Sequence, residues 1–497
     1  MRVSQSFGDP LPEPTHPAPE SSTPFRILVL ADFGASDSWG RPRRVDRDSL
    51  EDIFAALKVR LDLSVDEGAP TVRFEPKEPE QLHPDTLFEE LELFAALRTR
   101  RRRLQNSKTF EEESQAILAA SGAAAAEPEP TGEDSSAPAV DTGSLLDQAI
   151  QQTPDSQKPL GRQIAEGSLN LDAYVRQLVE PYVVAKADPR QAEFVGGVDQ
   201  AIAQTMRRVL HSEQFQRVES AWLGVKMLVR RLETDANLSI DIVNVSRDEL
   251  AGDVTAGENL QSSQLYKLLV ESTSVPGADA WTLVVGDYTF GTSADDTNVL
   301  GRIGRVCASG GSLFVGGGTM SVVGCDDPAA TPDPDDWAPP AEDQLADWNE
   351  LRATAEAANV ALAGPRLLAR LPYGAQADPI ESFKFEEIPD GTAHGSYLWM
   401  SPAYGVATIL ATAFSRAGWM LLSGWDPELD HLPTYVFKDG TESVMKPCGE
   451  IELVLRGGGL LASAGLTAVH SVRGRGAVLI PKLQSLANNG ALGTDWS

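Results

Sequence analysis

The stretch PFRILVLADFG, residues 24–34, gives the first indication of the fold class. It is a short apolar run closed by Asp32 and Gly34, a pattern typical of a strand buried inside a sheet. An amphipathic helix pattern, DSLEDIFAALKVRL, follows it, and TVRFEP then indicates a second strand. A further helix is predicted over Asp85–Leu104. Residues 24–104 therefore predict a small α/β unit of the size of a compact domain.

Residues 168–497 predict a second, larger α/β unit. Val198–Leu210 has a helical pattern, SIDIVNVS and WTLVVGDYTF have strand patterns, and GRIGRVCASGGSLFVGGG suggests a helix followed by a strand. In SPAYGVATILATAFSRAGW, Pro402 and Gly418 mark the two ends of a helix. The fold class predicted is α/β, with mixed sheets and flanking helices, in which the small N-terminal unit packs on the larger one. One helix, EQFQRVESAWLGVKMLVRRLE, has its apolar residues at spacings of three and four: Phe215, Val218, Trp222, Val225, Val229 and Leu232.

Two segments outside these units have a composition that opposes folding. Residues 1–23 are polar and proline-rich, which predicts a disordered lead, and residues 105–167 are rich in Ala, Pro, Ser, Asp and Glu, which predicts a linker. Within that linker SLLDQAIQQ, residues 144–152, has an apolar spacing. It is either a docking helix or the first helix of the larger unit.

The charge balance of the chain disfavours two classes of partner. Lys plus Arg number 42 against 72 Asp plus Glu, a net charge of −30. Nucleic acids and anionic membranes both require a cationic face, so neither is an expected partner. The basic run RTRRRR, Arg98–Arg103, closes a helix pattern and is expected to complement the helix dipole, with an acidic partner as the alternative.

The cysteine spacing and the length of the apolar stretches indicate where in the cell the protein is expected. The three cysteines have no CxxC spacing, and no stretch reaches the roughly 18 apolar residues that a membrane span requires. We expect a cytoplasmic protein that does not insert into a membrane.

A search for motifs that carry chemistry predicts no enzyme, no cofactor and no metal site. Gly457, Gly459 and Ala462 match the G-x-G-x-x-A pattern, but no acidic residue follows at the distance that dinucleotide binding requires, so a turn is the favoured interpretation. The acidic tract Asp326–Asp336 has the ligands that calcium prefers, but its prolines favour a solvated loop. The six histidines lie far apart in the sequence.

The segment GPRLLARLPYG, residues 364–374, is dense in polar and aromatic groups but contains no candidate nucleophile. On an extended strand Arg366 and Arg370 would point to the same face, because four residues are two strand periods. Glu386 or Glu387 could pair with them, either inside one fold or between protomers.

These residues also carry a family resemblance. GPRLLARLPYGAQADPIESFKFEE, followed by SYLWMSPAYGVATILATAFSRAGW, resembles the large subunit of the type VI secretion contractile sheath, the TssC (VipB, ImpC) family, and ordered matches extend over Val198–Trp425. PFRILVLADFG, RPRRVDRDSLEDI and LFAALRTRRRRL are similar to the small sheath subunit, the TssB (VipA, ImpB) family. The resemblance implies a small subunit fused to a large subunit that lacks the family's C-terminal part. It also implies structural or interaction roles for Arg366, Arg370, Tyr373, Glu386, Glu387, Trp222, Trp399 and Trp419.

The function that the resemblance implies is that of a structural sheath subunit, which assembles as a tubular or ring polymer around an inner tube for effector delivery. Its implied partners are itself or other sheath subunits, an Hcp-like inner-tube protein and baseplate components. A ClpV-like ATPase would bind residues 144–152. The alternative is a sheath-like adaptor, cap or regulator that does not polymerise and that binds true sheath or baseplate components.

Overall fold

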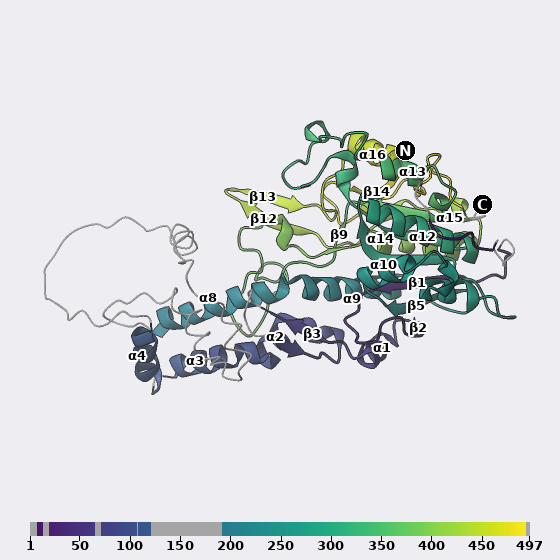
Figure 1. The fold of residues 1–497 in the computed structure, drawn as a ribbon. Helices are drawn as coiled ribbons and strands as arrows, with labels where there is room; N and C mark the ends of the chain where they lie inside the picture. The colour runs from purple at the N-terminus through teal and green to yellow at the C-terminus, as the bar shows by residue number, and fades with distance from the viewer. Residues whose placement is uncertain (1–6, 13–18, 65–70, 107, 121–190, 494–497) are drawn as a thin grey trace.

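A mixed sheet lies at the centre of the molecule (Figure 1). The computed structural model describes residues 7–12, 19–64, 71–106, 108–120 and 191–493. Within these residues, seven strands form the central sheet in the order β14-β8-β7-β6-β1-β5-β2, and each neighbouring pair is parallel except β2 with β5. The predicted α/β class with a mixed sheet is confirmed. The strands are β1 (Phe25–Ala31), β2 (Arg43–Val45), β5 (Leu238–Asn244), β6 (Leu283–Phe290), β7 (Leu313–Gly318), β8 (Val360–Gly364) and β14 (Leu466–Ala468).

Strand β1 lies inside this sheet, with neighbours on both sides. It pairs with β5 along its whole length on one side and with β6 on the other. Ile27 and Val29 face one layer of the core and Leu28 and Leu30 face the other, which explains why the strand is a continuous apolar run. The N-terminal segment, residues 24–104, therefore does not pack on the larger unit as a separate body. It shares the sheet, because an isolated apolar strand can bury both of its faces only between neighbouring strands.

Helices cover both faces of the sheet. One face packs against α8, α9 and α14, and the other against α10, α12, α13 and α16. The six apolar residues predicted to lie on one face of α9 are all buried, so that prediction is confirmed. These helices are α8 (Gln191–Leu210), α9 (Glu213–Arg231), α10 (Arg247–Thr255), α12 (Ala294–Gly310), α13 (Ala346–Arg352), α14 (Ala403–Ala417) and α16 (Leu455–Ser463).

Three helices form an arm that extends from the sheet (Figure 1). They are α3 (Ala95–Gln105), α4 (Phe110–Ala120) and the first part of α8. Helix α4 lies inside the range predicted to be a linker, and its Phe110 ring contacts Phe194 of α8, with ring centroids 5.9 Å apart. Arg101, from the basic run, binds Asp199 of α8 at 2.6 Å, and Arg103 binds Glu113 of α4 at 3.1 Å. The basic run thus has acidic partners within the chain.

The lead also differs from its prediction. Phe7 is 3% exposed and lies against Gly301 of α12, and the N–H of Asp9 donates to the carbonyl of Glu258 at 2.8 Å. A single aromatic side chain with a few backbone hydrogen bonds is therefore enough to fix residues 7–12, despite their polar surroundings. The candidate docking helix at 144–152 lies outside the described residues.

The helix predicted over Asp85–Leu104 is interrupted. The structure has α2 (Pro84–Glu90) and α3, with Leu91 in an extended conformation between them. Leu87, Phe88, Leu91 and Leu93 are all buried, and a straight helix would place them around more than half of its circumference. The break after α2 lets Leu87 and Phe88 on one side of it, and Leu91 and Leu93 on the other, all reach the core.

The glycine tract near the C-terminus is helical and does not form the predicted turn. Gly457 and Gly459 lie within α16. A Cβ at the neighbouring Gly458 would lie 2.2 Å from the ring of His470, so at that position the missing side chain allows a close approach within the fold.

The remaining elements are short. They are α1 (Leu50–Leu57), α11 (Gln264–Tyr266), α15 (Leu421–Gly424), the pair β3 (Leu61–Leu63) and β4 (Val72–Phe74), the pair β9 (Leu367–Leu368) and β10 (Trp399–Met400), the hairpin β12 (Tyr435–Asp439) and β13 (Glu442–Lys446), and the group β11 (Glu428–Leu429), β15 (His470–Ser471) and β16 (Val478–Leu479).

Candidate functional site

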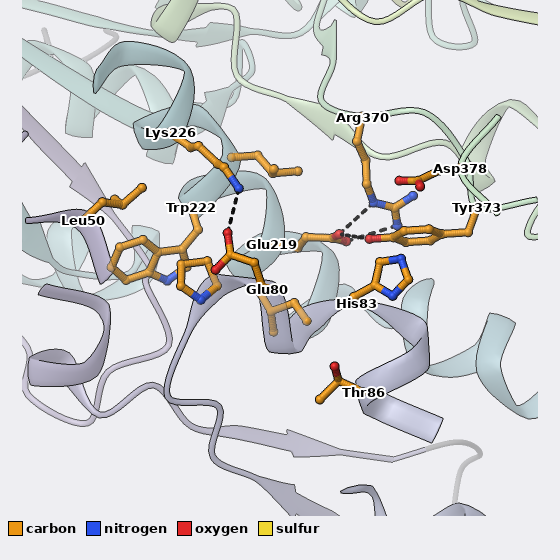
Figure 2. A pocket seen from close by; sticks show the side chains of 13 residues that line it. Leu50, Glu80, His83, Thr86, Glu219, Trp222, Lys226, Arg370, Tyr373 and Asp378 are labelled. Carbon is orange, nitrogen blue, oxygen red and sulfur yellow. Dashed lines mark hydrogen bonds and ion pairs between the residues drawn. The ribbon is translucent and has the colours of Figure 1, made fainter. Parts of the chain in front are cut away.

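A hollow of about 490 Å³ lies where the N-terminal segment meets α9 and the segment that follows β9 (Figure 2). The N-terminal segment contributes Glu80 and His83, which both precede α2, and α9 contributes Glu219, Trp222 and Lys226. Arg370 and Tyr373 line the opposite side, from the segment that the sequence singled out. The hollow is thus formed by three stretches that are far apart in the sequence.

The guanidinium group of Arg370 is the centre of a buried ionic cluster. Its Nε donates to Glu219 Oε1 at 2.7 Å, and its Nη1 donates to Glu387 Oε2 at 2.7 Å. Nη2 contacts the second oxygen of each carboxylate, at 3.2 Å for Glu219 and 3.1 Å for Glu387. The side chain of Arg370 is 11% exposed, and those of the two glutamates are 5% and 2% exposed. Arg370 therefore bridges two carboxylates that are almost completely removed from water.

The two carboxylates differ in their affinity for a proton. Burial raises the pKa of Glu219, although Arg370 opposes this shift. Burial would also raise the pKa of Glu387, but Arg370, the nearby His211 ring and the hydrogen bond from the Tyr373 N–H lower it to about 2. One guanidinium group cannot neutralise two buried carboxylates. Glu219 is therefore the carboxylate with the higher pKa, and Glu387 is the one that Arg370 holds ionised.

Tyr373 connects this cluster to the N-terminal segment. Its ring lies 4.1 Å from the Arg370 guanidinium carbon, and its hydroxyl is 3.5 Å from Glu219 Oε1. The ring of His83 meets the ring of Tyr373 edge-on, with centroids 5.0 Å apart. Nearby, Lys226 of α9 binds Glu80 at 3.0 Å. These contacts hold the N-terminal segment against the larger unit.

The pairing predicted for Arg366 with Glu386 or Glu387 is wrong. Arg366 does not share the cluster. Its Nε donates to Glu450 Oε2 at 3.0 Å, so the two arginines have separate partners. Glu386 accepts from the backbone N–H of Ala375 at 3.0 Å. Strand β9 is only two residues long, so the extended alternation that would align the two arginines does not persist.

Two of the three predicted tryptophans contact the N-terminal segment. Trp222 donates its indole N–H to the carbonyl of Phe33 at 3.2 Å. Trp419 packs against Phe25, with ring centroids 5.8 Å apart, and donates to the carbonyl of Thr23, just before the segment, at 2.8 Å. Trp399 instead lies against His394, with ring centroids 5.0 Å apart. Trp222 and Trp419 thus join the two parts of the chain.

Sequence reasoning missed Glu219, Glu450 and His83 as members of these clusters. Glu219 stands three residues before Trp222 on the face of α9 that was predicted to be buried, and a carboxylate on a buried helix face requires a cation. That signal was available for Glu219. Nothing comparable marks Glu450 or His83.

The charged groups of the Arg370 cluster bind one another, and this arrangement is suited to fixing parts of a chain in place. Among the described residues, no three side chains of His, Cys, Asp or Glu are grouped so that they could hold a metal ion. In the same part of the chain, no helix is long and apolar enough to cross a membrane.

Two comparisons with known proteins found similar sequences. The family described as EvpB/VC_A0108, tail sheath N-terminal domain (VipB), matches residues 192–487. The type VI secretion system sheath protein TssC1 of Pseudomonas aeruginosa is 31% identical over 264 residues, which is 51% of this chain and 52% of that protein. The chain thus spans about half the length of that relative.

Proposed function

Since the chain belongs to the VipB tail-sheath family, we propose that it is a structural subunit of a type VI secretion-like contractile sheath. The subunit would assemble with copies of itself or with other sheath subunits into a tubular polymer, around an inner tube that delivers effectors. The observation that carries this proposal is the family match over residues 192–487, which includes α8, α9 and most of the strands of the central sheet.

The chemistry of the candidate site is consistent with a structural role. Arg370, Glu219 and Glu387 bind one another inside the fold, and Tyr373 and Trp222 bind the N-terminal segment. A subunit that transmits force through an assembly needs parts that do not move relative to each other, and buried ion pairs with satisfied hydrogen bonds supply fixed geometry.

We further propose that the N-terminal segment, residues 24–104, corresponds to the small sheath subunit and is fused to the large one. A covalent connection between two proteins that pair as a protomer raises the effective concentration of each for the other. The position of β1 between β5 and β6 supports this proposal, because such an intimate pairing would benefit from a tether. A protease site introduced between residues 121 and 190 tests it. After cleavage, the two pieces are expected to elute together in gel filtration, and separation without denaturant would contradict the proposal.

The remaining partners belong to the same proposal. They are an Hcp-like inner-tube protein, baseplate components and a ClpV-like ATPase that would bind residues 144–152. The cytoplasm is the proposed location, because sheath assembly of this kind would take place there.

Electron microscopy of the purified chain, alone and co-expressed with an inner-tube protein, tests the main proposal. Tubes that co-purify with the inner-tube protein are the expected result. Monomers or isolated closed rings that never bind it would contradict a sheath role and would favour a sheath-like adaptor.

A further inference from the structure

Strands β12 and β13 form a hairpin (Figure 1), and a second polar cluster lies at its base. Lys446, the last residue of β13, has its Nζ 2.9 Å from His394 Nδ1. The other ring nitrogen of His394, Nε2, is 3.5 Å from Glu450 Oε1. Lysine, histidine and carboxylate thus form a chain of contacts in that order.

The carboxylate end of this chain is fixed. The side chain of Glu450 is 8% exposed and accepts from Arg366 as well as from His394. Burial would raise the pKa of Glu450, but hydrogen bonds from His394 and Arg366 lower it to about 2, so the group is ionised. An ionised Glu450 holds a proton on Nε2 of His394, and the Nδ1 lone pair then faces Lys446.

The lysine end is held over aromatic rings. Its Nζ lies 5.0 Å from the centre of the Tyr397 ring and 5.7 Å from that of Trp399, and the ring of His394 itself lies against Trp399. Burial lowers the pKa of Lys446, and the opposing attraction of Glu450 does not restore it. Lys446 is nevertheless only partly buried, so solvent reaches it. This lysine therefore loses its proton more readily than an exposed lysine does.

We propose that Lys446 is a nucleophilic lysine that is acylated by small acyl phosphates, with His394 as the base that accepts its proton and Glu450 as the group that orients the base. The arrangement of nucleophile, base and orienting carboxylate is the one that activates weak nucleophiles in general. Arg366, which binds Glu450 in the same cluster, is cationic and its side chain is 45% exposed, which favours an anionic donor.

The proposed step is balanced as follows. The lone pair of neutral Nζ attacks the acyl carbon, and a C–N amide bond forms. The C–O bond to the phosphate breaks, and phosphate leaves with the electron pair. One proton of Nζ passes to Nδ1 of His394 and from there to solvent. No oxidant or reductant is involved.

Acylation would change the surface at the hairpin. The amide carries no positive charge, so the cation–π contacts with Tyr397 and Trp399 would be lost. These contacts help to hold β13 against the body. The same hairpin exposes the cross-strand pair Val436 and Met445, which are 46% and 40% exposed, so a change in its position would alter an apolar surface.

The test is the rate of acetylation of each lysine in the full-length protein treated with acetyl phosphate, measured by peptide mass spectrometry. Exposed Lys438, on the other strand of the hairpin, is the internal reference. Lys446 is expected to react about tenfold faster than Lys438 near neutral pH, because burial lowers the pKa of Lys446 and His394 accepts a proton from the attacking amine. Equal rates would overturn the proposal.

The variant His394→Phe keeps a ring against Trp399 but removes the base. It is expected to reduce the rate at Lys446 to that at Lys438, and an unchanged rate would overturn the role of His394. If this variant does not fold, the pH profile of the unmodified chain decides. The rate at Lys446 should reach its plateau at lower pH than the rate at Lys438, and coincident profiles would overturn the proposal.

A neutral acyl donor serves as the control for the proposed preference for an anionic one. The ratio of the rates at Lys446 and Lys438 is expected to be larger with acetyl phosphate than with the neutral ester p-nitrophenyl acetate. Equal ratios would overturn the assignment of an anionic donor.

Discussion

Replacement of Arg370 by methionine should destabilise the fold strongly at neutral pH. Methionine fills a similar volume but leaves Glu219 and Glu387 buried without a cation. Removal of one partner from a buried ion pair typically costs about 3–5 kcal/mol.

The size of this loss of stability can be estimated from the cost of protonating a buried carboxylate. Without Arg370 the chain can avoid a buried charge by protonating Glu387, whose ordinary pKa is near 4.5. To hold that carboxyl neutral at pH 7 costs about 3.4 kcal/mol, since each pKa unit corresponds to about 1.36 kcal/mol. Glu219 contributes less, because burial already raises its pKa in the unmodified chain. The expected loss is therefore about 3 kcal/mol.

Urea unfolding of Arg370→Met at pH 7.5 and pH 5.0 measures this effect. In the unmodified chain the depressed pKa of Glu387 adds stability above about pH 4.5, which is lost as the pH falls through about 2. In the variant the folded-state pKa of this carboxyl is raised, so stability should increase as the pH falls from neutral. The difference between the two proteins should thus be smaller at pH 5.0.

Arg416→Met is a matched control. Arg416 binds Asp426 at 3.0 Å, but both side chains are about half exposed, so the expected loss is below about 1 kcal/mol. A loss below about 1 kcal/mol for Arg370→Met as well, or a loss that does not change with pH, would refute the reasoning about buried charge.

The two carboxylates provide a second comparison in the same assay. Glu219→Gln imitates the protonated form and should cost under about 1 kcal/mol, whereas Glu387→Gln removes the permanent anion beside Arg370 and should cost about 2–4 kcal/mol. The reverse order would contradict the assignment of the higher pKa to Glu219.

Three further changes test other parts of the fold by denaturant unfolding. Burial raises the pKa of Asp287 to about 7, so the unmodified chain should lose stability as the pH rises from about 4 to about 7, and Asp287→Asn should be the more stable protein at pH 8 by about 2 kcal/mol. A variant with the same pH slope as the unmodified chain would refute this. A Cβ at Gly224 of α9 would lie 2.3 Å from the buried ring of Tyr404, so Gly224→Ala should cost about 1–3 kcal/mol, although alanine favours a helix. Gly252→Ala, where a Cβ would meet nothing within 4 Å, should instead stabilise by about 0.5–1 kcal/mol, and equal effects would exclude a clash. Trp419→Phe keeps an aromatic ring but loses the hydrogen bond to the carbonyl of Thr23, which should cost about 1 kcal/mol, and no loss would mean that this bond adds nothing.

The local structure of much of the chain could be predicted from the sequence. β1 is an apolar run, β5 alternates apolar and polar residues, β6 begins with an apolar run, and α9 and α14 have helical periodicity. Hydrophobic periodicity depends only on residues that are near neighbours in the chain, so one sequence is sufficient to read it. The family resemblance rested on the same ordered elements, and the match to the tail-sheath family confirms it for the larger unit.

The candidate site could be predicted only in part. The sequence indicated that Arg370 requires an acidic partner and that Glu387 is a candidate, and this pair is present. It gave no basis for assigning Arg366 to Glu450, which lies 84 residues further along the chain. Burial imposes the need for a counter-charge, but only the path of the backbone decides which carboxylate arrives there.

The sequence alone determined the class of each element, the alternation that makes the chain α/β, and the residues that must leave water. Only the tertiary structure decided that β1 enters the sheet between β5 and β6, and that Glu219 and His83 meet Arg370 and Tyr373. The physical reason is the range of the interactions. Periodicity and caps act over a few residues, whereas strand order and buried ion pairs join residues that can lie more than a hundred positions apart, and those contacts form only when the whole core closes.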